Sequence, residues 1–366
     1  MQFIDLKTQY TKHRTEIDGR MARVLEHGQF IMGPEIEELE KALASYVGVA
    51  HAITVASGTD SLEIALRALG VGPGDEVITV PFTWISSCEV IGLVGAKPVF
   101  VDIDPVTYNL DVAKLAAAIT PRTKAILPVS LFGQMPDCDA INRIAAEWGI
   151  TVIEDAAQSF GSTQHGRKSC SVTTISSTSF FPAKPLGCYG DGGALFTDDD
   201  QLNETMRAIR THGGVKRHHH PLLGMNGRFD TLQAAVVLAK MPHFPDEVSA
   251  RSQIGARYTE RLRGFCVVPE IMPGNTHVYA QYTIRVGNRD ELGSALKAEG
   301  VPTAVYYPKC LHEQPVFSPL GYKWGDFPVS EHASRHVISL PMHPYLTETE
   351  QDKIVALVRK HATPAT

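Results

Sequence analysis

Residues 177–194 read STSFFPAKPLGCYGDGGA and place a single lysine, Lys184, between two prolines and ahead of a glycine-rich run. Prolines on both sides stiffen the backbone and exclude a helix. The glycines permit tight turns and a close approach of the backbone to another group. One interpretation is a positioned amine that forms a Schiff base with a carbonyl cofactor. The alternative is an ordinary solvated lysine on a loop, so the choice depends on the rest of the chain.

The lysine segment joins the last two of seven strand-like runs. Apolar, β-rich runs occur at 51–56, 76–80, 97–103, 124–130, 151–154, 173–180 and 193–197. Helical patterns separate most of them, which is typical of βαβ units and a mostly parallel sheet with helices on both faces. No helical pattern lies between the last two runs. The sequence therefore predicts an α/β fold with a sheet of about seven strands, in which one pair forms a hairpin.

The segments before and after these strands are predicted to be largely helical. Residues 1–32 form an arm and one helix, and Gly33-Pro34 starts another because proline suits the first helical position. Residues 198–250 form helices around a histidine-rich loop. Further along, the patterns predict strands at 278–286 and 303–307 and helices at 289–300 and 347–361. We therefore expect a large domain over residues 1–248 and a smaller C-terminal α+β domain over residues 249–366.

The composition is that of an ordinary globular protein. The 366 residues are 43% hydrophobic and 20% charged, with a formal net charge of −6 and no long basic run. A nucleic-acid or membrane-surface partner therefore has no electrostatic signature. The N-terminus lacks an apolar signal-peptide core, and no segment reaches the roughly 18 apolar residues of a membrane helix. The spacing of the six cysteines suggests neither a metal site nor a disulfide framework. Together these features predict a cytoplasmic protein with reduced thiols.

An anion site is one interpretation of residues 56–61, ASGTDS, which follow a strand and open a helix. Free backbone N–H groups at a helix N-terminus attract anions, and Gly58 permits close approach. The hydroxyl of Thr59 adds a donor. The alternative is a plain helix cap, because serine, threonine and aspartate favour that position anyway.

Two further groups follow strands at their carboxyl ends, where ligands bind in open α/β sheets. Asp155 directly follows the run 151–154 and can hold a proton on a pyridine nitrogen, while Gln158 can reach a ring hydroxyl. Trp84 follows the run 76–80 and can stack on a flat cofactor ring. The alternatives are a helix-capping aspartate and a core tryptophan.

The segment GMNGRFD at 224–230 contains Arg228, whose guanidinium forms a fork for a carboxylate or phosphate. A surface ion pair with Asp230 is the alternative. The sequence KRHHH at 216–220 is predicted to be a basic loop near an anionic substrate. We expect no metal site there, because consecutive histidines on a loop rarely converge on one ion.

The order of these motifs resembles one enzyme family nearly from end to end. The most specific matches are SGTDSLEIAL at 57–66, GPGDEVITVPFTW at 72–84, VIEDAAQSFGS at 152–162, GMNGRFDTLQAA at 224–235 and VPTAVYYP at 301–308, in addition to the lysine segment. They are similar to those of the nucleotide-sugar aminotransferases, the DegT-type branch of the pyridoxal phosphate (PLP) enzymes of fold-type I. A nicotinamide dehydrogenase is disfavoured, because no G-x-G-x-x-G motif follows the first strand.

The resemblance implies a role for each motif around the cofactor ring. Lys184 forms the Schiff base with PLP, and Asp155 pairs with the ring nitrogen. Gln158 approaches the 3′-hydroxyl, and Trp84 stacks on the ring. In related dehydratases of the family the lysine is a histidine, so Lys184 favours amine transfer.

The resemblance also implies a phosphate site and a shared active site. Gly58, Thr59 and Ser179 bind the cofactor phosphate, and Asn226 reaches the phosphate in the neighbouring subunit's site. A homodimer with shared active sites follows from that arrangement.

Within the family, the lysine segment and GMNGRFDTLQAA look most like enzymes that aminate UDP-2-acetamido-2-deoxy-3-oxo-glucuronate for bacterial surface polysaccharide such as O-antigen. In that reading Arg228, Tyr306 and Tyr307 hold the sugar carboxylate, and glutamate is the amino donor. Close members have His at the position of Tyr306. Another keto-sugar carried by dTDP or GDP, a PLP-dependent dehydratase, and a non-catalytic PLP-binding regulator stay open as alternatives.

Overall fold

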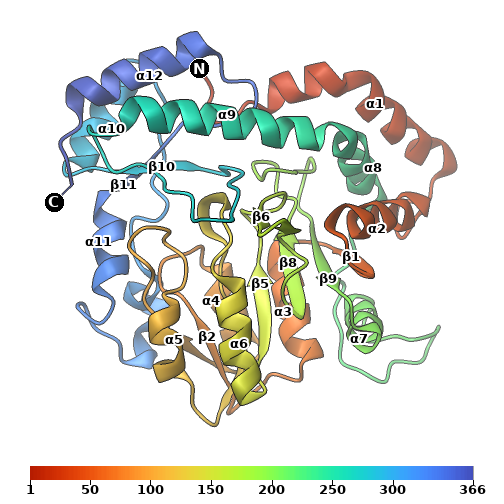
Figure 1. Ribbon diagram of the computed structural model, residues 1–366. Coiled ribbons are helices and arrows are strands. Elements are labelled where there is room, and N and C mark those ends of the chain that lie inside the picture. Colours follow the sequence, from red (N-terminus) through yellow and green to blue (C-terminus); the bar gives the residue numbers. More distant parts are fainter. Residues whose placement is uncertain (366) are drawn as a thin grey trace.

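The computed structural model describes residues 1–365 and is built around one large sheet (Figure 1). Its strands lie in the order β1-β9-β8-β5-β4-β2-β3. In chain order they are β1 (His51–Val55), β2 (Glu76–Thr79), β3 (Lys97–Phe100), β4 (Thr123–Ile126), β5 (Thr151–Asp155), β8 (Ile175–Ser179) and β9 (Gly193–Thr197). All seven predicted strands are present.

Strand β9 is antiparallel to both of its neighbours, β1 and β8, and the other pairs are parallel. The carboxyl ends of the remaining six strands therefore lie at one edge of the sheet. The prediction of an α/β fold with a mostly parallel seven-stranded sheet and one hairpin-like pair is confirmed. The connection between the antiparallel strands β8 and β9 is the lysine segment.

Alternating side chains place the sheet between two hydrophobic cores. In β1, Ile53 and Val55 pack with Ile64 of helix α3, whereas Ala52 packs with Leu39 of helix α2. Helices cover both faces of the sheet as a result. The helices of this part are α1 (Leu6–His27), α2 (Pro34–Val47), α3 (Gly58–Ala68), α4 (Ser86–Leu93), α5 (Val112–Ala118), α6 (Cys138–Trp148), α7 (Asp200–Arg210) and α8 (Thr231–Lys240).

The C-terminal part has its own small sheet and core, at the top of Figure 1. Strand β10 (Tyr282–Arg285) pairs antiparallel with β11 (Val337–Leu340). The helices are α9 (Phe244–Leu262), α10 (Arg289–Ala298), α11 (Pro328–His336) and α12 (Glu348–His361). The expected domain boundary at 248 falls within α9, and the division into two domains stays a prediction.

Three short elements differ from the sequence-based expectations. The predicted strand at 303–307 is wrong, because only Ala304 makes a β-bridge there, to Ser339. Strand β11 was not predicted, since it follows α11 directly without a turn signal. A two-stranded ribbon, β6 (Thr163–Gln164) with β7 (Arg167–Lys168), was also not predicted.

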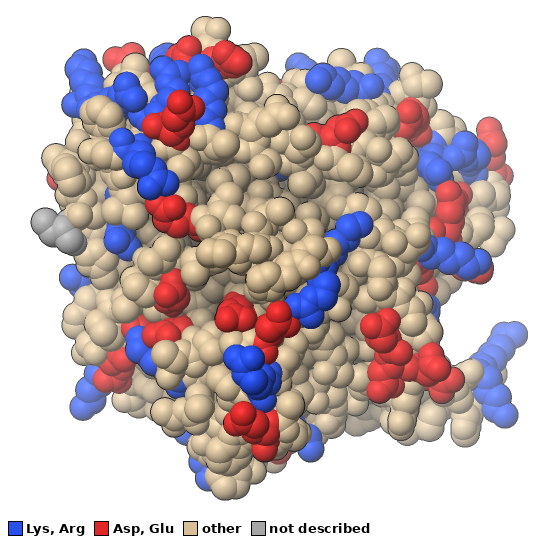
Figure 2. Space-filling model, in the orientation of Figure 1, with Lys and Arg blue, Asp and Glu red and all other residues tan. Residues whose placement is uncertain are grey.

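The surface shown in Figure 2 carries lysine and arginine side chains interspersed with aspartate and glutamate. Within residues 1–365, no helix combines the length and the apolar character needed to span a membrane.

Candidate active site

A cavity of about 410 Å³ lies at the edge of the sheet where the six strands end. Its wall includes nine of the residues that the sequence predicts for the site: Gly58, Thr59, Trp84, Asp155, Gln158, Ser179, Lys184, Tyr306 and Tyr307. These residues span positions 58 to 307 of the chain. The sheet brings together those that follow its strands, because the carboxyl ends of its parallel strands meet at one edge.

The lysine loop, residues 180–192, is fixed at several points. Its backbone turns at Lys184, whose N–H donates to Phe181 O at 2.8 Å. The buried Lys240 of α8 donates from Nζ to Gly187 O at 2.7 Å. Also from α8, Gln233 accepts the N–H of Tyr189 at 2.8 Å. The rigidity suggested by the two prolines is therefore reinforced by helix α8.

The lysine amine faces a buried carboxylate. Desolvation lowers the pKa of Lys184, an effect that the charge of Asp155 partly opposes. Burial raises the pKa of Asp155, while donors and the charge of Lys184 act in the opposite direction. The donors are Ser87 Oγ, at 2.8 Å from Oδ2, and the N–H of Ala157, at 3.1 Å from Oδ1. The site therefore favours a neutral amine and supplies Asp155 with partners suited to its ionised form.

Two aromatic residues and one amide line the cavity next to this pair. Trp84 is 59% exposed, so it is not the core tryptophan of the alternative interpretation. Its ring centroid lies 6.2 Å from that of Tyr307. The buried Gln158 donates from Nε2 to the Tyr307 hydroxyl at 3.0 Å and accepts the N–H of Phe132 at 2.8 Å.

The start of α3 combines a helix cap with free donors. Ser57 Oγ accepts the N–H of Asp60 at 3.0 Å, so the capping interpretation is correct for this serine. The N–H groups of Gly58 and Thr59 make no hydrogen bond within residues 1–365. A Cβ on Gly58 would lie 2.8 Å from Ser179 Cβ, so glycine keeps the two chain segments close together. The two free N–H groups form a place for an anion.

Two predicted residues lie elsewhere. Asn226 is exposed and Arg228 is half-buried, and neither lines the cavity of its own chain. Arg228 Nε has no hydrogen-bond partner within the described residues. Tyr306 does line the cavity, with its ring 6.3 Å from that of Phe3 in the N-terminal arm.

Other residues of the site were missed by the sequence reasoning. Ser87, Asp191 and Gln281 were not predicted, although the last two line the cavity and Ser87 holds Asp155. The position of Ser87, just after the PFTW motif, was a usable signal. The backbone N–H of Phe132 has no sequence signal, because any residue except proline carries one.

The loop that contains KRHHH is a small turn in which Lys216 and His219 form a β-bridge. His220 is hydrogen-bonded through Nδ1 to His212 O at 2.9 Å. Among residues 1–365, no group of three or more histidine, cysteine, aspartate or glutamate side chains is arranged to hold a metal ion.

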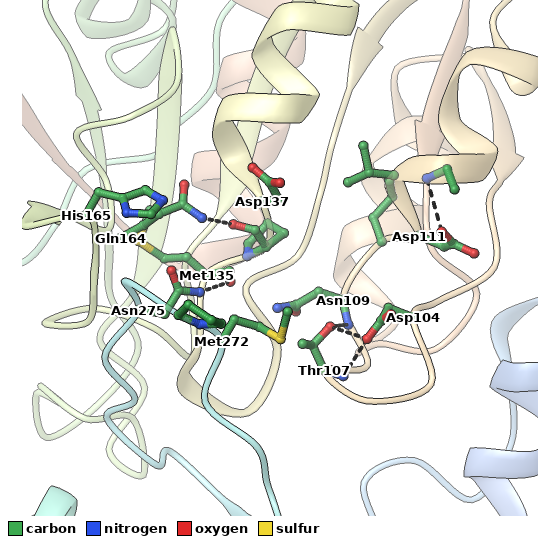
Figure 3. Close-up of a pocket in the computed structure, with 15 residues that line it drawn as sticks. Asp104, Thr107, Asn109, Asp111, Met135, Asp137, Gln164, His165, Met272 and Asn275 are labelled. Carbon is green, nitrogen blue, oxygen red and sulfur yellow. Dashed lines mark hydrogen bonds between the residues drawn. The ribbon is translucent and has the colours of Figure 1, made fainter.

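A second cavity, of about 290 Å³, lies between the loop that precedes α5 and the segment around Met272 (Figure 3). Its carboxylates are already engaged, because Asp104 caps its own turn and Asp111 and Asp137 cap α5 and α6. These bonds explain the acidic wall without a ligand.

Comparison with known proteins decides the family. Residues 11–359 match the DegT/DnrJ/EryC1/StrS aminotransferase family. The chain belongs to this family. It is 53% identical over 356 residues to the UDP-2-acetamido-2-deoxy-3-oxo-D-glucuronate aminotransferase of Pseudomonas aeruginosa, covering 97% of this chain and 98% of the relative. It is 46% identical to the "Pleiotropic regulatory protein" of Geobacillus stearothermophilus, covering 96% of each chain.

Solved structures agree with this assignment. A DegT/DnrJ/EryC1/StrS aminotransferase from Brucella abortus has a TM-score of 0.96 at 44% identity, covering 98% of this chain and 99% of that one. NtdA from Bacillus subtilis, with bound cofactor PMP, has a TM-score of 0.89 at 33% identity, covering 98% and 83%. The protein is thus a PLP-dependent sugar aminotransferase of fold-type I.

The residues of the cavity fit PLP. The free N–H groups of Gly58 and Thr59 suit a phosphate, and a side chain at position 58 would collide with Ser179, which lines the same cavity. Asp155 is a buried carboxylate suited to a protonated ring nitrogen. Exposed Trp84 offers a flat face for the ring.

Proposed function

We propose that this aminotransferase moves the amino group of glutamate to UDP-2-acetamido-2-deoxy-3-oxo-D-glucuronate and forms the 3-amino sugar. The observation that carries the proposal is the cavity that joins Lys184 to Asp155, in a chain 53% identical to an enzyme named for that substrate. The product belongs to the synthesis of bacterial surface polysaccharide, such as O-antigen. The unpaired state of the six cysteines supports a cytoplasmic location.

The side chains of the cavity divide the chemistry between them. Bound PLP supplies an electron sink for the charge left on carbon when a proton is removed. Lys184 Nζ, whose pKa is lowered by burial, takes the proton from the donor's α-carbon and later returns one. Ionised Asp155 keeps the proton on the ring nitrogen, and Ser87 stabilises that charge.

Substrate contacts are assigned to two tyrosines of the cavity wall and to one arginine. Tyr306 and Tyr307 lie in its wall and suit the sugar and its carboxylate. Arg228 suits the same carboxylate through its guanidinium fork, and it acts from the neighbouring subunit in this proposal.

A homodimer with shared active sites completes the proposal. Asn226 and Arg228 lie outside the cavity of their own chain, which supports a role for them in the site of the partner. Exposed apolar side chains are suited to the interface. They include Leu25, Phe30, Ile31, Met32 and Leu223.

A half-reaction experiment tests the reaction and the substrate. The enzyme with PLP is mixed with glutamate, and the cofactor absorbance is expected to change. UDP-, dTDP- and GDP-linked keto-sugars are then added, and the UDP-3-oxo-glucuronate is expected to restore the first spectrum. Recovery with a dTDP- or GDP-linked sugar alone contradicts the substrate assignment. No response to glutamate supports the regulatory alternative suggested by the second relative.

Mixed dimers test the shared site. A Lys184→Ala chain and an Asn226→Ala chain are each expected to have little activity. Refolding them together at equal amounts places both defects in one site of each mixed dimer and leaves the other site intact, which restores about a quarter of wild-type activity. An absence of recovery, in mixtures shown to contain mixed dimers, contradicts sharing.

A further inference from the structure

The amide of Gln158 has a fixed orientation. Its Oε1 accepts the backbone N–H of Phe132 at 2.8 Å, and its Nε2 donates to Tyr307 Oη at 3.0 Å. A backbone N–H can only donate, so it selects the carbonyl end of the amide. Gln158 therefore presents N–H groups, and not its oxygen, toward the cavity. The direction of the Phe132 N–H decides which kind of hydrogen bond Gln158 offers to a ligand.

That N–H is directed by an unusual turn, the 3₁₀ segment η1 (Leu131–Gly133). Phe132 has φ 59° and Gly133 has φ 123°. A bulky residue with positive φ is uncommon and persists where its surroundings enforce it. The cause of this conformation therefore lies in the groups that hold the turn.

One side chain holds both ends of the turn. Asn109, which is 2% exposed, accepts the N–H of Leu131 at its Oδ1, 2.9 Å away. From Nδ2 it donates to Gln134 O at 3.0 Å. The same amide thus fixes the residue before Phe132 and the residue that follows Gly133. Asn109 comes from the loop before α5 and lines the second cavity (Figure 3).

A second set of bonds holds the turn from the C-terminal part. Gln134 accepts the N–H of Met272 at 2.7 Å and donates to Glu270 O at 3.0 Å. Val278 N donates to Gly133 O at 3.0 Å. These bonds reach the end of the turn. Leu131 O accepts the N–H of Gln134 across it, and among the side chains of residues 1–365 only Asn109 hydrogen-bonds to both residues.

We propose that Asn109 is a positioning residue of the active site, which holds the turn at 131–134 so that Phe132 fixes Gln158 as a hydrogen-bond donor to the cofactor. The inference rests on the proposed function and on the position that the family resemblance implies for Gln158, beside the ring oxygen of PLP. Asn109 itself does not line the catalytic cavity. It acts through two backbone groups and one amide.

The test compares Asn109→Ala with Asn142→Ala in the full-length enzyme loaded with PLP. Asn142 is the matched control, since its Nδ2 donates to a backbone oxygen, Val172 O, at 2.8 Å. Loss of the hydrogen bond donated by Gln158 disfavours the ionised form of the ring oxygen of PLP. Asn109→Ala is therefore expected to raise the pH of the cofactor's absorbance transition by about 0.5–1 unit. It should also weaken PLP binding about tenfold. The control should match wild type in both.

A double-mutant cycle separates positioning from general destabilisation. Gln158→Ala is expected to shift the absorbance transition in the same direction, and adding Asn109→Ala to it should change nothing further. Additive effects overturn the proposal, as does an unchanged transition in Asn109→Ala. Where Asn109→Ala does not fold, Asn109→Asp keeps the acceptor for Leu131 and loses the donor to Gln134, and a smaller shift in the same direction is expected. These readouts need no sugar substrate, so they stay valid if the proposed substrate is wrong.

Discussion

Acidification is expected to destabilise the protein through His277, which packs against the turn at 131–134. Burial lowers the pKa of His277 to about 3. Its Nδ1 accepts the N–H of Tyr279 at 2.9 Å, and the two rings are stacked with centroids 4.1 Å apart. A Cβ on Gly133 would lie 3.0 Å from the same Nδ1. Protonation of His277 therefore removes an acceptor and places a charge beside the turn.

The sign and size of this change in the free energy of unfolding follow from the linkage between protonation and folding. Between pH 6.5 and pH 3 the unfolded chain binds a proton at His277 that the folded chain does not. The stabilisation by His277 is therefore complete above pH 6.5 and is lost as the pH falls. At pH 5, about 1.5 units below the unfolded pKa, the loss relative to pH 8 is about 2 kcal/mol.

The measurement compares urea unfolding of wild type and His277→Asn at pH 8 and pH 5, at one protein and cofactor concentration. Asparagine keeps an acceptor near Nδ1 and does not titrate. Other groups titrate equally in both proteins, so wild type should lose about 2 kcal/mol more free energy of unfolding than the variant. Equal losses in the two proteins refute the reasoning.

Three further substitutions test the site. Lys240→Met removes the bond to Gly187 O and should lower the free energy of unfolding by about 1–3 kcal/mol, measured in urea. Ser87→Ala should raise the pKa of Asp155 further, and the PLP dissociation constant at pH 6, followed by fluorescence, should rise about tenfold. Gly58→Ala introduces a clash at the phosphate site, so binding of PLP should weaken while binding of pyridoxal, which lacks the phosphate, stays unchanged.

The sequence predicted the large sheet well because its strands are apolar runs separated by clear helical patterns. It failed for 303–307, where β-rich residues face the catalytic cavity through Tyr306 and Tyr307 instead of pairing in a sheet. It also missed β11, a buried run of four residues. Short elements of this kind are defined by their partners in space, which local patterns do not contain.

The residues of the candidate site divide in the same way, into those that local sequence patterns predict and those that depend on partners in space. Asp155 and the residues after β1 and β2 were predictable because they lie at the carboxyl ends of parallel strands, at one edge of the sheet. Ser179 was named only through the family resemblance. The turn around Phe132 was not, since it depends on the side chain of Asn109 and on a backbone N–H. Its glycine, Gly133, gave no signal that distinguishes it from other glycines in loops.

The antiparallel placement of β9 has a consequence for the motion of the lysine. Because β8 ends and β9 begins at the same edge, residues 180–192 are anchored at both ends in one sheet, and hydrogen bonds from α8 hold the loop between them. Displacement of the amine is then expected to come from rotations about the bonds of its side chain. The backbone amide of Cys188, which donates to Phe180 O at 2.7 Å, should exchange its hydrogen slowly even during turnover. The tip of the side chain, in contrast, should reorient within nanoseconds once it is released.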